Sequence, residues 1–486
     1  MHRAIVLVIT MLSLAPLSGQ AAGMGYDDAR HLLMRSGFAP SQAEVQSYAA
    51  LSRSQAVDRL LAATRPRAQT PVPSWVNEPF VSLSTLKNLT QEERKALQRQ
   101  QIERGIELRS WWYEEMLNTP APLGERMTLF WHNHFVSSQQ KVKSAQLMYR
   151  QNELLRQHAL GNFGTLLRAV AKDPAMLIYL DNATSRRGQP NENFARELME
   201  LFTLGMGHYG EQDVKEAARA FTGWSLDRDT GEFRFYKVLH DPGTKTVLGR
   251  SGDFDGEAVL DILLAHPQTA EFVTAKLWRE FVSPKPDTLQ VRKFAKIFRD
   301  SEYEIKPLLR ALFNSDAFFA KENRGVLVKS PVEMLVGTVR QFGIDGMDPR
   351  LLVFSGRLLE QDLFGPPNVK GWPGGEAWIN STTLLGRKQV LDRLFRAEER
   401  VAVGEPRMLR AVEFGKRDSR PQAAQALMNV RFDAQRFFDA FPGGPERQRA
   451  SIARLLFGDS PTQMPSTAGH VDFIRKLVLD PMYQLK

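Results

Sequence analysis

The stretch TQEERKALQRQQIERGIELRSWWYEEM, residues 90–116, decides the fold class of this chain. Thr90 and Glu93 stand three residues apart, which is the spacing of a capping box at a helix N-terminus. No proline interrupts the stretch, and Asn118 and Pro120 follow it as helix-stopping residues. This pattern predicts one long helix through Met116.

The rest of the chain shows the same kind of pattern, because apolar residues recur with the helical period in segment after segment. Further helices are predicted at 27–37, 41–49, 124–135, 152–170, 191–204, 211–221, 254–265, 267–282, 288–300, 304–313, 330–342, 349–362, 384–398, 420–428, 432–440, 446–457 and 468–477.

Three segments depart from the helical pattern. Residues 66–85 are rich in proline, which indicates a linker on the surface, and residues 364–378 are typical of a Gly/Pro/Trp loop. Residues 232–249 alternate and contain a turn, which predicts a small β-hairpin. Strands do not alternate with helices, so a doubly wound or barrel fold is disfavoured. We expect a large multi-helix domain over residues 22–400 with this hairpin inserted, and a C-terminal helical subdomain over 401–486.

The N-terminus has the composition of a secretory signal peptide. Arg3 precedes an apolar run of about 14 residues, shorter than the roughly 20 that a membrane-spanning helix needs. Gly19 and Ala21 then provide the small residues of a cleavage site. We therefore expect residues 1–21 to be removed, no transmembrane segment to remain, and the protein to be periplasmic or secreted.

Composition narrows the function classes. The formal charge of +9 is spread along the chain, and no aromatic and basic motif accompanies it, so nucleic acid is not an expected partner. The sequence has no cysteine, which excludes disulfides and thiolate chemistry. It also lacks the Gly-x-Ser-x-Gly, Walker A, His-Glu-x-x-His and Cys-x-x-Cys-His motifs.

The densest polar cluster lies on the predicted helix 191–204. Its charged and amide side chains share one face at about 100° per residue, and an apolar face lies opposite. An ordinary amphipathic helix with ion pairs would show the same pattern. The excess of carboxylates also suits a divalent metal ion or an acid–base pair. The cluster consists of Glu192, Asn193, Arg196, Glu197 and Glu200.

Two histidine motifs offer further candidates. His132 and His134 would lie about 200° apart on a helix, so only one of them could face a site, and a buried structural histidine is the alternative. His240 and Asp241 precede Pro-Gly, a pattern that is in the first place typical of a turn. The pair could also supply a general base or a metal ligand.

The loop at 364–378 carries two tryptophans. Trp372 and Trp378 could stack on sugar rings, or they could fix the loop to the core.

Eight segments follow one another along the chain: RHLLMRSGFAPS, ERMTLFWHNHFVSS, NENFARELMELFTLG, DVKEAARAFTGWSL, HDPGTKTVLG, HPQTAEFVTAKLWREFV, KSPVEMLVG and GPPNVKGWPGGEAW. In this order they resemble the bacterial DUF1800 family. The resemblance covers roughly residues 27–400 and implies an exported protein, often encoded beside a DUF1501 protein that looks like a relative of sulfatases or alkaline phosphatases. It implies no reaction.

Two functions remain open at this point. The first is a periplasmic hydrolase of envelope polymers, either metal-assisted or using general acid–base chemistry. Its expected catalytic residues are Glu197, Glu200, His134, His240 and Asp241. A divalent metal ion would be held by Glu192, Glu197, Glu200 and His134. The substrate would be bound by Arg196, Asn193, Trp372 and Trp378. The second is a non-enzymatic binding or scaffold partner of a DUF1501-like exported protein.

The signal-peptide prediction is open to a direct test. The small residues at Gly19 and Ala21 place the cut after Ala21, so the mature chain is expected to begin at Ala22 or Gly23. N-terminal sequencing of exported material checks this, and a chain that still carries Met1 would contradict it.

Overall fold

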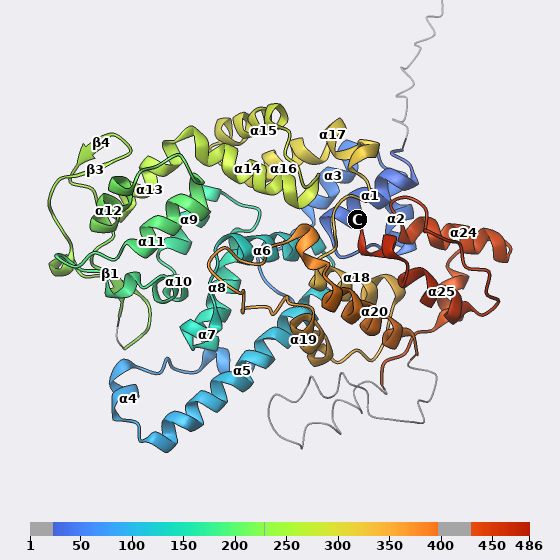
Figure 1. The fold of residues 1–486 in the computed structure, drawn as a ribbon, viewed down its shortest axis with the longest axis horizontal. Coiled ribbons are helices and arrows are strands. Elements are labelled where there is room, and N and C mark those ends of the chain that lie inside the picture. Colours follow the sequence, from blue (N-terminus) through green and yellow to red (C-terminus); the bar gives the residue numbers. More distant parts are fainter. Residues whose placement is uncertain (1–22, 228, 397–428) are drawn as a thin grey trace, which may run out of the picture.

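The computed structural model describes residues 23–227, 229–396 and 429–486. Within these ranges the chain is mainly helical, with two small two-stranded antiparallel sheets, which confirms the predicted fold class (Figure 1). No helix in these ranges is long and apolar enough to cross a membrane. The predicted signal peptide and the predicted helix at 420–428 lie outside the described residues.

The long helix predicted from the capping box is α5, Gln91–Asn118. The Thr90 hydroxyl accepts from the Glu93 amide at 3.3 Å, and the Glu93 carboxylate accepts from the Thr90 amide at 2.7 Å. The C-terminal half of α5 is buried among neighbouring helices, whereas its N-terminal half extends away from the body (Figure 1).

The residues before α5 form four helices and a short 3₁₀ turn. The third helix was not among the predicted elements, and it begins at a capping box in which Ser52 accepts from the amide of Gln55. The proline-rich stretch contains the 3₁₀ turn. The elements are α1 (Tyr26–Ser36), α2 (Gln42–Ala49), α3 (Arg53–Ala62), the turn Ser74–Asn77 and α4 (Leu83–Asn88).

The helix predicted at 152–170 is two helices. The side chain of Asn162 accepts from the amide of Thr165 and begins a new helix, so the first one ends at His158. Residues 120–180 form α6 (Pro122–His134), α7 (Gln139–Val142), α8 (Ala145–His158), α9 (Phe163–Ala171) and α10 (Pro174–Tyr179).

The helix predicted at 191–204 changes type along its length. It starts as α11 (Glu192–Glu197), continues as the π-helical turn Leu198–Thr203, and is followed by α12 (Glu211–Ala220). A π-turn is wider than an α-turn. The face calculated at about 100° per residue therefore does not hold beyond Glu197.

The single hairpin predicted at 232–249 is two hairpins. β1 (Trp224–Leu226) pairs with β2 (Phe233–Phe235), and β3 (Lys245–Val247) pairs with β4 (Arg250–Gly252). Leu248 and Gly249, which join β3 to β4, both have positive φ. Two positive-φ residues make the tight turn that returns a strand onto its neighbour at once.

The remaining chain is helical up to and beyond the interval 397–428. Its helices are α13 (Gly256–Ala265), α14 (Pro267–Phe281), α15 (Thr288–Asp300), α16 (Ile305–Phe313), α17 (Asp316–Phe319), α18 (Pro331–Phe342), α19 (Pro349–Leu358), α20 (Ser381–Arg396), α23 (Ala434–Asp439), α24 (Pro445–Leu456) and α25 (His470–Val478). Short 3₁₀ turns lie at Asn182–Thr184, Lys237–Leu239, Lys321–Asn323, Gly375–Trp378 and Pro481–Gln484.

The last residues pack against the start of the chain and against the segment before α18. The Arg30 guanidinium donates to the Leu455 carbonyl at 2.6 Å. The amide of Lys486 donates to the Leu327 carbonyl at 2.8 Å, and the amide of Lys329 donates to the Gln484 carbonyl at 2.8 Å. Figure 1 shows this end of the chain beside α1 and α18. The separate subdomain predicted over 401–486 stays a prediction.

A buried ion pair joins α5, α6 and α8. The carboxylate of Glu125 accepts from Arg156 Nε at 2.6 Å, from Arg156 Nη2 at 2.9 Å and from Trp112 Nε1 at 2.7 Å. Glu125 is 3% exposed and Arg156 is 2% exposed. A buried charge that loses its partner is costly, so these contacts fix the relative positions of the three helices.

We expect Glu125→Gln to lower the free energy of unfolding by about 3 kcal/mol, because it leaves the Arg156 guanidinium short of its main counter-charge. Chemical denaturation followed by circular dichroism measures the change. Glu114→Gln, at an exposed position of α5, removes the same charge and serves as the control. Equal stability of the two variants would contradict the role given to the ion pair.

Candidate functional site

A cleft of about 540 Å³ opens where α6, α14, the segment before α18 and the loop at 370–378 meet. We call it the central cleft, and we call residues 370–378 the cleft loop. Charged and polar side chains line much of it. The ionisable residues among its lining are Arg126, His134, Lys276, Arg279, Glu280, Glu333, Lys370, Glu376 and Lys486.

His134, the last residue of α6, lies in the wall of the central cleft and is 3% exposed. Its Nε2 lies 3.1 Å from the Phe202 carbonyl, and its Nδ1 lies 3.0 Å from Lys276 Nζ. A carbonyl only accepts, so Nε2 carries the proton and Nδ1 is the acceptor. Burial and the neighbouring lysine hold the pKa of His134 well below its usual value, so the ring is neutral at pH 7.

Lys276 reaches the same point from α14. Its Nζ donates to His134 Nδ1 at 3.0 Å and to the Leu201 carbonyl at 3.0 Å. Burial, reinforced by repulsion from Arg279, lowers the pKa of Lys276 to about 7. A substantial fraction of the side chain is therefore the neutral amine at neutral pH.

The two acceptor contacts of Lys276 have a chemical consequence. A neutral amine has two N–H bonds, and the His134 ring and the Leu201 carbonyl can accept both of them. The lone pair on Nζ then remains free to take a proton. A cleft residue with a strongly shifted pKa and fixed partners is a candidate acid–base group.

Both carbonyls come from the end of the π-helical turn Leu198–Thr203. The last carbonyls of a helix have no partner within it and need donors from elsewhere. Lys276 satisfies the carbonyl of Leu201, and His134 satisfies that of Phe202. Single π-turns within helices occur often at functional sites. Three of the motifs quoted above, from α6, α11 and α14, thus meet at one point.

Asn133 holds the cleft loop against α6. Its Oδ1 accepts from the Trp372 amide at 2.7 Å, and its Nδ2 donates to the Trp372 carbonyl at 3.3 Å. Gly371 has φ +83°, and a Cβ at this position would lie 2.9 Å from the Asn133 carbonyl oxygen. The close approach therefore depends on glycine.

The two tryptophans of the cleft loop belong to the cleft lining, but they are almost fully buried. Trp372 is 3% exposed and Trp378 is 4% exposed. A side chain that stacks on a sugar needs an open face, so this burial favours the second interpretation, in which the tryptophans fix the loop to the core.

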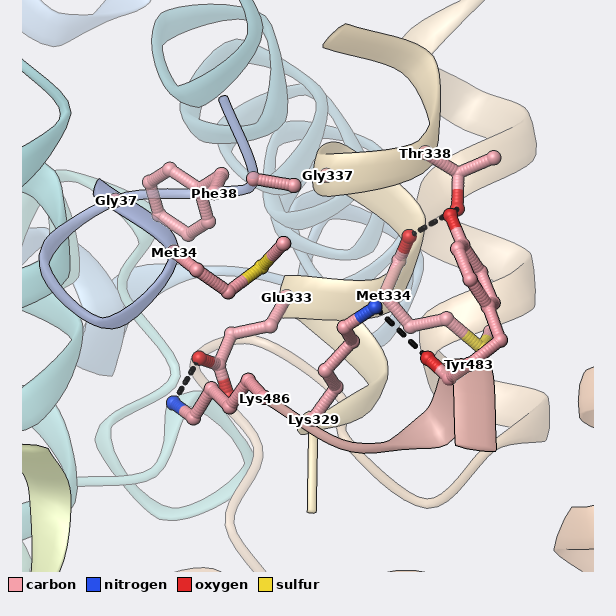
Figure 2. A pocket seen from close by; sticks show the side chains of 11 residues that line it. Met34, Gly37, Phe38, Lys329, Glu333, Met334, Gly337, Thr338, Tyr483 and Lys486 are labelled. Atoms are coloured by element: carbon pink, nitrogen blue, oxygen red, sulfur yellow. Dashed lines mark hydrogen bonds and ion pairs between the residues drawn. The ribbon is translucent and has the colours of Figure 1, made fainter. Parts of the chain in front are cut away.

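A smaller cavity, shown in Figure 2, shares Glu333 and Lys486 with the lining of the central cleft. Arg126 Nη1 lies 2.9 Å from the Glu333 carboxylate, which also pairs with Lys486, and Arg126 pairs in addition with Glu280. Figure 2 shows the ion pair between Glu333 and Lys486 and the hydrogen bond that Lys329 donates to the Tyr483 carbonyl. These cations hold the pKa of Glu333 well below its usual range, so it is ionised.

The predicted polar cluster on α11 and the π-turn lies outside the central cleft lining. Arg196 pairs with Glu192 at 3.1 Å and with Glu211 at 2.6 Å, and Glu200 accepts from the Tyr209 hydroxyl at 3.0 Å. Most of this cluster thus follows the amphipathic alternative, with half-buried residues in ion pairs and hydrogen bonds.

Two members of the cluster make fewer contacts. Asn193 lies half-buried in the first turn of α11, where its backbone N–H donates to the side-chain oxygen of Asn191. Burial and the neighbouring Glu200 raise the pKa of Glu197, while Lys370 of the cleft loop lowers it. The charge of Lys370 on the cleft loop therefore acts on Glu197, although Glu197 does not line the cleft.

His240 and Asp241 make local contacts. His240 Nδ1 lies 3.0 Å from the Thr222 carbonyl, and the Asp241 carboxylate pairs with Arg219 at 2.9 Å and accepts from the Gly243 amide. Arg219 holds the pKa of Asp241 at about 2. These residues fix the turn before β3 and do not join His134.

The predicted metal ligands lie in different surroundings. Both ring nitrogens of His134 contact Phe202 and Lys276, so no glutamate of the polar cluster binds to this ring. In the part of the chain that the structure describes, no group of three or more His, Asp or Glu side chains is arranged to hold a metal ion. The set Glu192, Glu197, Glu200 and His134 is therefore not brought together.

Sequence reasoning missed Lys276, Arg279 and Glu333. All three lie in segments that carried the family resemblance, yet a single Lys, Arg or Glu on an amphipathic helix usually faces solvent. Only the tertiary structure places Lys276 beside a buried histidine, because α6 and α14 come together from distant parts of the chain.

We expect Gly371→Ala to loosen the cleft loop for two reasons. The new Cβ would clash with the Asn133 backbone, and the alanine would have to adopt a left-handed conformation. Hydrogen–deuterium exchange at the Trp372 amide should become faster. Gly374→Ala is the matched control, because Gly374 also has positive φ but a Cβ added there would have no atoms within 4 Å. Equal exchange in the two variants would show that the Asn133 contact is unimportant.

Comparison with known proteins agrees with the resemblance found in the motifs. The sequence model of the DUF1800 family, described as a protein of unknown function, matches residues 31–479. The match continues past residue 400, where the motifs recognised in the sequence end. No curated protein and no solved structure matches this chain.

Proposed function

We propose that this chain, which belongs to the DUF1800 family, is an exported hydrolase that acts on a polymer of the cell envelope and uses Lys276 for general acid–base catalysis. One observation carries the proposal. Lys276 Nζ lies in the central cleft between two fixed acceptors, and its pKa is lowered to about 7. The N-terminal signal-peptide pattern supports export.

The proposed reaction moves one proton through Nζ. The neutral amine takes a proton from a water molecule as the water oxygen attacks the scissile bond, and the ammonium then returns a proton to the leaving oxygen. Water adds across the bond, and Lys276 ends in the form in which it began. A positioned acid–base group of this kind contributes roughly 10²–10⁴-fold to a rate.

His134 acts as a positioning residue in this scheme. Its Nε2–H is fixed by the Phe202 carbonyl, so its Nδ1 faces Lys276 as an acceptor. The neutral ring avoids a second positive charge beside Nζ, which would lower the pKa of Lys276 further. The Leu201 carbonyl fixes the amine from another direction.

The alternative is a non-enzymatic binding or scaffold partner of a DUF1501-like exported protein. In that case Lys276 and His134 would serve only to satisfy the carbonyls at the end of the π-turn. The two functions differ in what they predict for Lys276, because a purely structural lysine would affect stability without affecting any reaction.

The test uses the purified full chain with peptidoglycan sacculi and with lipopolysaccharide, and measures soluble fragments released. The rate should rise as the pH increases through about 7, because only deprotonated Lys276 acts as the base; a lysine with an ordinary pKa would require a pH above about 10. Lys276→Met should abolish release. Lys276→Arg should not restore it, because a guanidinium stays protonated.

Lys306→Met, at an exposed position of α16, is the control and should leave release unchanged. Full activity of Lys276→Met would disprove the catalytic role. Absence of release by the wild-type chain, together with a lower melting temperature of Lys276→Met, would favour the scaffold function.

A further inference from the structure

We infer that Arg279 binds an anionic group of the ligand in the central cleft, so that the substrate of the proposed hydrolase is acidic and carries a carboxylate or a phosphate. The statement that the anion belongs to a substrate rests on the proposed function. The anion site itself is inferred from the charges of the cleft. The site lies one helical turn from Lys276, on the same face of α14.

The basic side chains of the central cleft are not all paired with acids. Its lining contains the cations Arg126, Lys276, Arg279, Lys370 and Lys486, and the acids Glu280, Glu333 and Glu376. Two cations and two acids form a closed network of ion pairs, since Arg126 pairs with Glu280 and Glu333 while Lys486 pairs with Glu333. That network neutralises itself and leaves Glu376 as the remaining acid of the lining. No ion pair joins these two described residues, Glu376 and Arg279.

Arg279 and Lys370 are the cleft cations whose side chains have neither an ion pair nor a hydrogen bond within the described part of the chain, and the one on α14, near Lys276, is Arg279. Its side chain is exposed, and it has no ion pair or hydrogen bond with any residue in 23–227, 229–396 or 429–486. Its sequence neighbour Glu280 is occupied by Arg126. A guanidinium presents a planar set of donors that binds a carboxylate or phosphate through two parallel hydrogen bonds.

Two buried arginines add positive charge next to segments that line the cleft. Arg35 donates to the carbonyls of Phe281 and Val282, at 3.1 and 3.0 Å, directly after the turn that carries Arg279. Arg387 donates to the side chain of Gln484 and to the Lys329 carbonyl, both at 3.0 Å. Both arginines are 0% exposed and bind neutral oxygens rather than carboxylates.

These buried cations give the cleft a positive field that a bound anion would reduce. An anion at Arg279 would also offset the repulsion that Arg279 exerts on Lys276. Ligand binding would thus shift Lys276 toward its protonated form, which is the form that donates to a leaving group. The anion site and the acid–base site are coupled through their charges.

The test measures binding of inorganic phosphate and, separately, of acetate by isothermal titration calorimetry at low ionic strength, where charge interactions are weakly screened. We expect the full wild-type chain to bind at least one of the two anions. Arg279→Gln should weaken that binding by roughly tenfold or more, as the loss of a charge-assisted pair predicts. Binding of phosphate alone identifies a phosphate ligand, and binding of acetate alone identifies a carboxylate.

Arg250→Gln, at an exposed position of β4, removes the same charge and should bind like the wild type. Failure of the wild type to bind either anion, or equal binding by Arg279→Gln, would overturn the inference. Because Arg279 is exposed and unpaired within the described part of the chain, the melting temperature of Arg279→Gln should stay unchanged, which separates lost binding from lost folding.

The same variants separate this inference from the proposed function. If Lys276→Met remains active while Arg279→Gln loses anion binding, the anion site stands and the acid–base role of Lys276 fails. If Lys276→Met is inactive while Arg279→Gln binds anions normally, the acid–base role stands and the anion site fails.

Discussion

The carbonyls at the end of the π-helical turn are the constraint on which the candidate site depends. The last turn of a helix leaves carbonyls without intrahelical partners, and buried carbonyls need donors. Here the donors are His134 from α6 and Lys276 from α14. Because the two side chains also bind each other, three elements distant in sequence are fixed at one point. The position in which Lys276 satisfies this backbone carbonyl is also the buried one that lowers its pKa.

Local rules predicted much of the fold. Capping boxes at Thr90 and Ser41 begin helices where expected, because the signal and the structure involve the same few residues. The apolar period runs on through Asn162 and hides its capping role, so one predicted helix is two in the structure. Pairing of the short strands was predicted less well, because the position of the β3–β4 turn depends on Leu248 and Gly249 adopting positive φ, which the sequence does not indicate for leucine.

The candidate site was less predictable than the fold. His134 was correctly placed on a helix among the candidates, but its partners are a carbonyl and a lysine rather than glutamates. The polar cluster looked functional because charge density is visible in a sequence. Burial is not visible in a sequence. Lys276 therefore has the pattern of a surface lysine, although its Nζ contacts His134 of α6 and the Leu201 carbonyl. The pKa of a group depends on such coverage more than on residue type.

The contact between Asn133 and Trp372 determines how the cleft can change shape. The amide side chain pairs with both polar groups of one backbone residue, as an adjacent strand would, so this part of the cleft loop moves together with α6. Trp378 anchors the other end of the loop in the core. Between the anchors, Gly374 and Gly375 have open space around them. Any movement of the cleft loop relative to α6 is therefore expected in the short span between Trp372 and Trp378.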